Sequence, residues 1–216
     1  VRPAIGLRQT NYLLTNSQQF ESTISRSVPV FSTDAQLFLE RRLRLFDTPL
    51  MQTLEPRAYY VLMPKVGQSD IPVFDTGLYD FTFLQLFNEN RFAGRDRIGD
   101  TNQVALALTS RFLSLDSGRE LLRTSLGQIY YFRDREIALP GADVLDDSTS
   151  EFIGEVATNP VESWSARATL QWDPHDNRTE KSAFSLRYAP PDGTAVNAAY
   201  RLRRAVTDVE QTDLSW

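Results

Sequence analysis

The sequence predicts an all-β fold, an antiparallel transmembrane β-barrel of which this chain forms a partial wall of about ten strands. Three observations predict it. Apolar and polar residues alternate with a period of two in successive segments, short turn motifs alternate with long polar links, and no apolar run reaches the roughly 20 residues that a membrane helix needs. The 216 residues are 41% hydrophobic and 24% charged, with a net charge of -5 and no cysteine. This acidity disfavours a dedicated nucleic-acid binder, and the lack of cysteine excludes disulfides and thiolate metal sites.

The predicted strands rest on alternation, because successive side chains of a strand point to opposite sides of the sheet. In the segment 54–62, Leu54 and Tyr60 share one side, whereas Glu55 and Arg57 share the other. Similar patterns run through the chain. We expect strands at residues 4–13, 30–43, 54–62, 103–112, 121–132, 151–158, 163–172, 182–188, 195–203 and 209–216.

The connections between these strands differ in length. Turn motifs that close hairpins occur at residues 115–118 (LDSG), 158–160 (TNP) and 190–193 (PPDG). Long polar links occupy residues 65–101 and 133–150. Short turns at one end and long loops at the other are typical of a bacterial outer-membrane barrel. A general outer-membrane porin or channel and a soluble β-sandwich binding module fit the alternation as well, and both stay as alternatives.

A barrel wall assigns a side to each residue, because a charged side chain facing lipid at mid-membrane costs about 2–4 kcal/mol. We expect an apolar set to face lipid, namely Leu106, Leu108, Leu170, Phe184 and Leu186. We expect a charged set to face the lumen, namely Glu55, Arg57, Arg111, Arg167, Arg187 and Arg201. The lumen arginines either pair with carboxylates such as Asp34, Glu40 and Glu55 or guide phosphate groups through the interior by charge attraction.

No catalytic, cofactor-binding or metal-binding constellation is recognisable, so the sequence does not predict an enzyme. The single histidine, His175, lies in a turn without a second histidine or a cysteine nearby. Carboxylates crowd the first long link without the spacing of an EF-hand calcium loop. We expect them to form a solvated loop with Arg91, Arg95 and Arg97; they are Asp70, Asp75, Asp80, Glu89, Asp96 and Asp100.

An ordered series of motifs between residues 52 and 132 resembles the LptD family, the outer-membrane lipopolysaccharide-assembly proteins also called organic solvent tolerance proteins. The motifs are QTLEPRA at 52–58, QSDIP at 68–72, FD at 74–75, NRFAGRDRI at 90–98, NQV at 102–104, LTSR at 108–111 and GQIYYF at 127–132. The flanking strands fit only by pattern.

The resemblance implies a very large barrel in the bacterial cell outer membrane, an N-terminal jellyroll that receives lipopolysaccharide from a periplasmic Lpt bridge, and an LptE-type lipoprotein that plugs the lumen. It implies assembly and insertion of lipopolysaccharide into the outer leaflet. Residues 1–216 would then be one partial barrel domain, with both termini cut inside the barrel and the jellyroll absent. Such a piece is not expected to close into a stable barrel by itself.

The first long link is too rich in large apolar residues to stay in water. Links longer than about 12–15 residues are usually functional or disordered. We therefore expect residues 65–101 to fold inward and to contribute to plug docking through Phe92, Gly94, Arg95, Asp96 and Arg97. The alternative is a lid that packs only on its own barrel.

Overall fold

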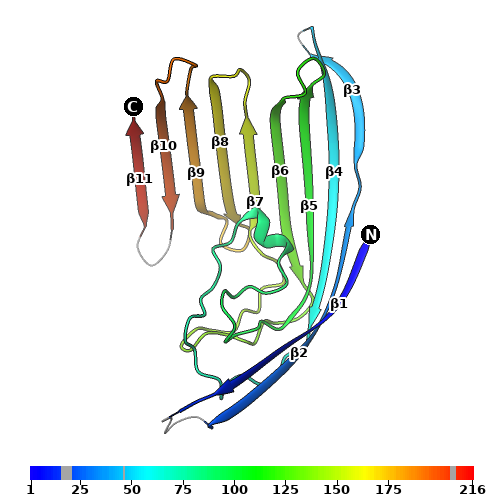
Figure 1. The fold of residues 1–216 in the computed structure, drawn as a ribbon, viewed down its shortest axis with the longest axis vertical. Helices are drawn as coiled ribbons and strands as arrows, with labels where there is room; N and C mark the ends of the chain where they lie inside the picture. The colour runs from blue at the N-terminus through cyan, green and yellow to red at the C-terminus, as the bar shows by residue number, and fades with distance from the viewer. Residues whose placement is uncertain (16–20, 46, 205–207) are drawn as a thin grey trace. The chain divides into compact units, whose positions relative to one another are not determined.

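The computed structural model describes residues 1–15, 21–45, 47–204 and 208–216. They form an 11-stranded antiparallel sheet (Figure 1). The strands are β1 (Arg2–Leu13), β2 (Thr23–Gln36), β3 (Leu39–Leu45), β4 (Thr48–Met63), β5 (Thr101–Ser114), β6 (Glu120–Tyr131), β7 (Phe152–Thr158), β8 (Trp164–Asp173), β9 (Arg178–Tyr188), β10 (Val196–Arg203) and β11 (Val209–Ser215). A single 3-10 turn, η1 (Phe83–Phe87), is the helical element of the described residues. No described helix has the length and apolar character needed to span a bilayer.

The strand order in the sheet is β1-β2-β4-β5-β6-β7-β8-β9-β10-β11, and β3 pairs with β4 outside this path. Apart from β2 and β3, which both pair with β4, sequence neighbours are therefore also neighbours in the sheet, as consecutive hairpins require. Within the described residues β1 and β11 stand at the two ends of the order, so this sheet is open. The all-β, antiparallel prediction is confirmed.

The predicted strand at residues 30–43 is wrong in its bounds. The structure begins β2 at Thr23, ends it at Gln36 and starts β3 at Leu39. The interruption lies opposite Pro56 of β4, whose carbonyl oxygen accepts the N–H group of Leu37. Proline has no N–H group to return to the ladder, so regular pairing breaks at this point.

The strand predicted at residues 54–62 is longer than its alternation suggested, because β4 starts at Thr48 and pairs with β3 along Leu39–Leu45. Asp47 joins the two strands with a positive φ of 63°. Aspartate is among the residues that enter this left-handed region most readily. The other predicted strands are confirmed, with small shifts at their ends.

The chain divides into two compact units. Unit 1 comprises Val1–Ala35, Ala58–Leu106 and Ile129–Ser150, and unit 2 comprises Gln36–Arg57, Ala107–Gln128 and Glu151–Trp216. Unit 1 contains both long links, between β4 and β5 and between β6 and β7. Its core includes Val28, Val61, Met63, Leu86 and Ala105, each at most 1% exposed.

Candidate functional site

The buried carboxylate of Asp100 holds the two long links of unit 1 together. It accepts the backbone N–H groups of Glu136 (2.9 Å) and Ile137 (3.0 Å) in the second link. Arg91 of the first link lies 3.5 Å from the same carboxylate and donates to the carbonyl oxygen of Ile137. Burial by itself would raise the pKa of Asp100, but the N–H donors and the Arg91 charge outweigh it and lower the pKa. Asp100 is therefore an ionised clamp between the links.

A second buried carboxylate, Asp96, organises the interior of the first link. It accepts the backbone N–H groups of Phe74 (2.8 Å) and Asp75 (3.1 Å) and the hydroxyl of Thr76 (3.3 Å). The hydroxyl of Tyr12, on β1, donates to the other oxygen at 3.2 Å. Burial opposes ionisation of Asp96, yet these donors lower its pKa below the ordinary value. One carboxylate thus joins two distant parts of the link to a strand.

Arg26 of β2 also binds this segment through hydrogen bonds. This side chain is 2% exposed and donates to the carbonyl oxygens of Arg95 (2.5 Å) and Asp96 (2.8 Å). It also donates to the amide oxygen of Gln68 at 2.6 Å. The Gln68 amide in turn bonds both backbone groups of Ile98, at 2.9 and 2.7 Å. The link is therefore attached to its own strands largely through its backbone.

Gly94 permits the turn that brings Asp96 into place. Its φ is +75°, a conformation that L side chains rarely adopt. A Cβ at this position would lie 2.7 Å from the Thr76 hydroxyl oxygen and 2.9 Å from a carboxylate oxygen of Asp75. Both the backbone angle and the space therefore require glycine.

The structure brings the five predicted docking residues into one segment but not onto one surface. Phe92, Asp96 and Arg97 are 3%, 4% and 6% exposed, whereas Gly94 and Arg95 are exposed. The aromatic ring of Phe92 lies beneath the guanidinium of Arg91, 4.8 Å from its centroid. The buried side chains of this segment therefore pack within unit 1.

The expectation of a solvated loop is wrong for Asp96, Arg97 and Asp100. Arg97 donates to the carbonyl oxygen of Ile71 at 2.8 Å, and the two carboxylates bond mainly to backbone N–H groups. The reason is that an apolar link folded on a sheet also encloses its own backbone. Enclosed N–H and C=O groups must be paired, and charged side chains are the partners here.

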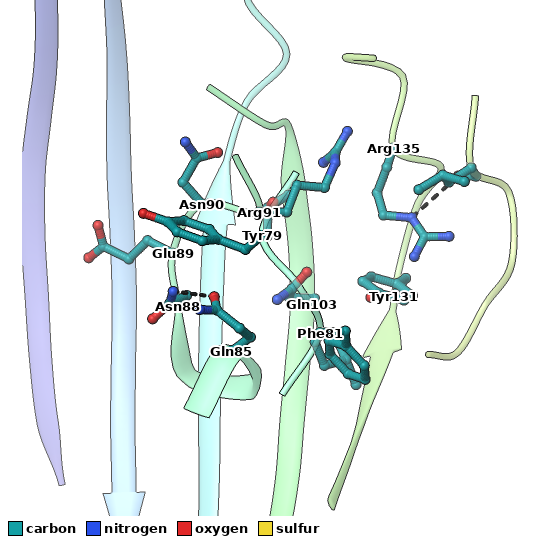
Figure 2. Close-up of a pocket in the computed structure, with 13 residues that line it drawn as sticks. Tyr79, Phe81, Gln85, Asn88, Glu89, Asn90, Arg91, Gln103, Tyr131 and Arg135 are labelled. Carbon is teal, nitrogen blue, oxygen red and sulfur yellow. Dashed lines mark hydrogen bonds between the residues drawn. The ribbon is translucent and has the colours of Figure 1, made fainter. Parts of the chain in front are cut away.

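A cavity of about 90 Å³ opens in unit 1 among the first link, η1, β5 and β6 (Figure 2). Its lining includes Tyr79, Phe81, Gln85, Asn88, Glu89, Asn90, Arg91, Thr101, Gln103, Ile129, Tyr131, Arg135 and Leu145. Sequence reasoning missed this site. The available signal was Gln103, a polar residue on the side of β5 that also carries Thr101 and Ala105, both of which are buried.

Three predicted lumen arginines of unit 2 share one face of the sheet, namely Arg167, Arg187 and Arg201. Directly opposed residues of an antiparallel sheet lie on the same face. Arg167 of β8 opposes Ser185 of β9, and Arg201 of β10 opposes Ala183 of β9. Because positions 183, 185 and 187 are alternate residues of β9, Arg187 lies on that face too. Within the described part of unit 2 these three arginines make no ion pair.

The same face continues towards β4. The hydroxyl groups of Thr109 and Ser125 are 3.0 Å apart. Ser125 opposes Glu155, and Glu155 opposes Thr169, which lies on the same face of β8 as Arg167. Arg111, two residues from Thr109, lies 3.1 Å from the 6% exposed carboxylate of Glu55. Arg57, on the same side of β4 by alternation, is half-buried.

The opposite face presents exposed apolar side chains within the described residues. Leu170 opposes Ser182, and Ser182 lies on the opposite face of β9 from residues 183, 185 and 187. Leu106, Leu108, Leu170 and Phe184 are 45–47% exposed, and Leu186 is partly exposed. The two residue sets predicted to face lipid and lumen thus lie on opposite faces wherever the register links them.

His175 lies in the exposed turn between β8 and β9, as expected. Carboxylate oxygens of Asp173, Asp176 and Glu180 gather within 4.8 Å of one another at this turn. Arg178 forms ion pairs with both Asp176 and Glu180. The cluster is thereby neutralised in part by its own arginine.

The open antiparallel sheet defines an all-β class of protein, and comparison with known proteins supplies the family. The family described as "LptD: LPS transport system D" matches residues 1–215. This chain belongs to the LptD family.

Curated relatives of this family carry the name LPS-assembly protein LptD. The chain is 47% identical to the one from Nitrosococcus oceani over 94% of its own length, and 28% of that relative is covered. It is 42% identical to the one from Aromatoleum aromaticum over 100% of its length and 27% of the relative. For Alkalilimnicola ehrlichii the identity is 44%, over 99% of the chain and 29% of the relative. The chain thus spans less than a third of the length of these relatives.

Proposed function

We propose that this chain forms part of the wall of a transmembrane β-barrel that assembles lipopolysaccharide in the outer leaflet of the bacterial outer membrane. Family membership carries the proposal, because the relatives are named LPS-assembly protein LptD and the family is an LPS transport system. The proposed role is assembly and transport, without catalysis. The two chemically opposite faces of the sheet support a place in a membrane.

In this proposal the apolar face contacts lipid and the charged face borders the lumen. Glu55, Arg57, Arg111, Arg167, Arg187 and Arg201 are then lumen residues. A charge turned to lipid at mid-membrane would cost about 2–4 kcal/mol, and the register keeps these charges off the apolar face. The open edges at β1 and β11 would pair with further strands of a longer protein.

The proposed partners follow from the family. Lipopolysaccharide is the cargo, a periplasmic Lpt bridge delivers it through a jellyroll, and an LptE-type lipoprotein plugs the lumen. Of the five predicted docking residues, Arg95 has an exposed side chain, and the Arg26 contact fixes its backbone. We propose Arg95 as a plug contact, while Phe92, Asp96 and Arg97 hold the link in position.

The membrane assignment can be tested with a matched pair of arginine substitutions in the full-length protein. Phe184, 46% exposed on the apolar face, opposes Tyr200, and Ala199 is adjacent to Tyr200 but on the charged face. In a membrane Phe184→Arg should cost about 2–4 kcal/mol, whereas Ala199→Arg should be tolerated. The measurements are the amount of folded protein in the outer membrane and lipopolysaccharide labelling at the cell surface. Equal tolerance of both changes would contradict the membrane-facing assignment.

The plug contact has its own test. Arg95→Glu should reduce the amount of lipoprotein that co-purifies with the full-length protein, because the change reverses an exposed charge. Arg42→Glu, on exposed β3, is the matched control and should leave co-purification unchanged. Undiminished lipoprotein on the Arg95 variant would leave the link as a lid on its own barrel.

A further inference from the structure

One charged side chain of unit 2 lies on the face that carries the exposed apolar residues. Arg41 of β3 opposes Gln52 of β4 in the register, so both side chains lie on one face of the sheet. The Gln52 amide donates to the Ser110 hydroxyl at 3.1 Å, which places Ser110 of β5 on this face as well. Leu108, two residues from Ser110 along β5, belongs to the exposed apolar set. Arg41 therefore shares a face with leucines and not with the lumen charges.

A relay of hydrogen bonds fixes the Arg41 guanidinium. Its Nε donates to the Gln52 amide oxygen at 2.7 Å. The Gln52 amide donates in turn to Ser110, whose hydroxyl donates to the backbone carbonyl oxygen of Thr53 at 2.9 Å. Among the described residues the two terminal amino groups of Arg41 have no hydrogen-bond partner. A planar fork held at its Nε can present both amino groups to one anion with little further loss of freedom.

A hollow of about 310 Å³ adjoins this guanidinium. Its lining comprises Leu39, Glu40, Arg41, Gln52, Thr53 and Leu54. Leu39 opposes Leu54 in the register, and these side chains are 54% and 39% exposed. The Glu40 side chain lies on the opposite face by alternation, so its carboxylate does not repel an anion here. The hollow thus suits a ligand in which an anionic group is attached to hydrocarbon.

The position along the strands indicates which membrane leaflet this hollow meets. Gln52 and Ser110 lie in the halves of β4 and β5 that adjoin short turns. The N–H group of Leu115, in the β5–β6 turn, donates to the carbonyl oxygen of Pro49 at the start of β4, so the β3–β4 and β5–β6 turns lie at the same end. Short turns of outer-membrane barrels are periplasmic, and a long arginine side chain extends toward the nearer headgroups. The hollow therefore adjoins the inner leaflet.

We propose that Arg41 binds the phosphate of a glycerophospholipid in this leaflet, while an acyl chain of the same lipid covers Leu39 and Leu54. The phosphate supplies the oxygens that a guanidinium fork recognises, and the acyl chain removes the leucines from water. Inorganic phosphate would leave these leucines uncovered. The inference rests on the proposed function, which places the sheet in a membrane and assigns lipopolysaccharide to the other leaflet.

The test is lipid binding by the full-length protein, purified in detergent and measured by native mass spectrometry. The probes are phosphatidylglycerol, diacylglycerol with the same acyl chains, and inorganic phosphate. Phosphatidylglycerol should bind at least tenfold more tightly than either of the others, because each of them lacks one half of the recognised chemistry. Phosphate that binds as tightly as the lipid, diacylglycerol that does so, or a second protein bound through Arg41 instead of a lipid overturns the proposal.

Variants locate the binding. Arg41→Leu removes the guanidinium and should weaken phosphatidylglycerol binding at one site about tenfold. Arg42→Leu is the matched control, because Arg42 is the next residue of β3 and is also exposed, but lies on the opposite face. Arg41→Lys keeps the charge without the planar fork and should give an intermediate loss, which covers the case that Arg41→Leu does not fold. Equal lipid binding in folded Arg41 and Arg42 variants overturns the site.

The Phe184→Arg and Ala199→Arg pair separates this inference from the proposed function. If Phe184→Arg alone is disruptive and lipid binding does not depend on Arg41, the membrane assignment stands and the lipid site is wrong. If both substitutions are tolerated equally, the membrane assignment fails. A lipid adduct that Arg41→Leu removes would then still establish the phosphate site.

Discussion

The two units use the same strand chemistry but differ in what they bury. Nearly every buried apolar side chain of the described residues belongs to unit 1; Leu50 and Ile153 represent unit 2. In unit 2, large apolar residues such as Leu108, Leu170 and Phe184 are 46–47% exposed. Strand alternation therefore sets the two faces but does not by itself make a core.

The long links make the difference. They supply Ile71, Leu86, Phe92 and Ile98 to the interior of unit 1, and Phe87 packs against Tyr59 of β4 with ring centroids 6.3 Å apart. Unit 2 has short turns in their place, so its charged face stays open within the described structure. One lesson is that a link can cover a strand face only if the enclosed backbone of the link is paired, here by buried side chains such as Asp96, Arg26 and Gln68.

The strongest way to break this comparison is to remove the carboxylate that organises the first link. Asp96→Ala would leave the N–H groups of Phe74 and Asp75 unpaired inside unit 1, and should destabilise the link by about 3 kcal/mol. Hydrogen exchange of residues 68–98 in the full-length protein should then become about a hundredfold faster. Asp75→Ala is the control, because its side chain is exposed and its N–H group is kept. Equal exchange in both variants would show that Asp96 does not hold the link.

Acid should loosen the same link. The pKa values of Asp96 and Asp100 are both lower in the folded protein than in the unfolded chain. Their contribution to stability is therefore fully present above the unfolded pKa and is lost as the pH falls through the folded pKa. Protection of the links from hydrogen exchange, corrected for the intrinsic rate, should decline on acidification below about pH 4. Asp96→Asn should flatten this decline, and a decline that persists unchanged would assign it to other groups.

A smaller effect is expected at Gly94. Gly94→Ala combines the cost of a positive φ, about 1–2 kcal/mol, with a contact of 2.7 Å to Thr76. Gly118 has a similar φ of +69° in a unit 2 turn but open space around it. Gly118→Ala therefore measures the backbone cost alone. The melting temperature of the full-length protein should be lowered more by Gly94→Ala than by Gly118→Ala. Equal shifts would mean that the link accommodates the added Cβ without loss of stability.

The sequence predicted the strands and the two faces because both depend on local periodicity. Alternation around Glu55, Arg111 and Arg167 placed the charges on one face, as the register confirms. The break between β2 and β3 was not predicted because it depends on Pro56, which lies on the neighbouring strand β4. The residue pattern of one strand carries no information about a missing N–H group on the strand that pairs with it.

The interior of the first link was beyond such reasoning for a related cause. Arg26 and Asp96 are 70 residues apart, and Gln68 meets Ile98 across 30 residues. The apolar content of the link indicated that it must be buried; the structure buries Ile71, Leu86 and Phe92 but leaves Phe74, Leu78, Tyr79 and Leu84 exposed. Which polar residues would be buried with it depends on the path of the folded backbone, and the sequence contains no local signal for that path.

The smallest effect is expected on the open face of unit 2. Arg187 makes no ion pair within the described residues, and its side chain is exposed. Arg187→Ala should therefore change the stability of the full-length protein by no more than about 0.5 kcal/mol. Arg111→Ala is the informative contrast, because it would leave the buried Glu55 carboxylate without its 3.1 Å partner and should cost more. Melting curves recorded with and without co-purified lipoprotein decide the matter. If Arg187→Ala destabilises only the lipoprotein-bound form, a partner covers this face in the assembled protein, and the contrast between the units belongs to the isolated chain alone.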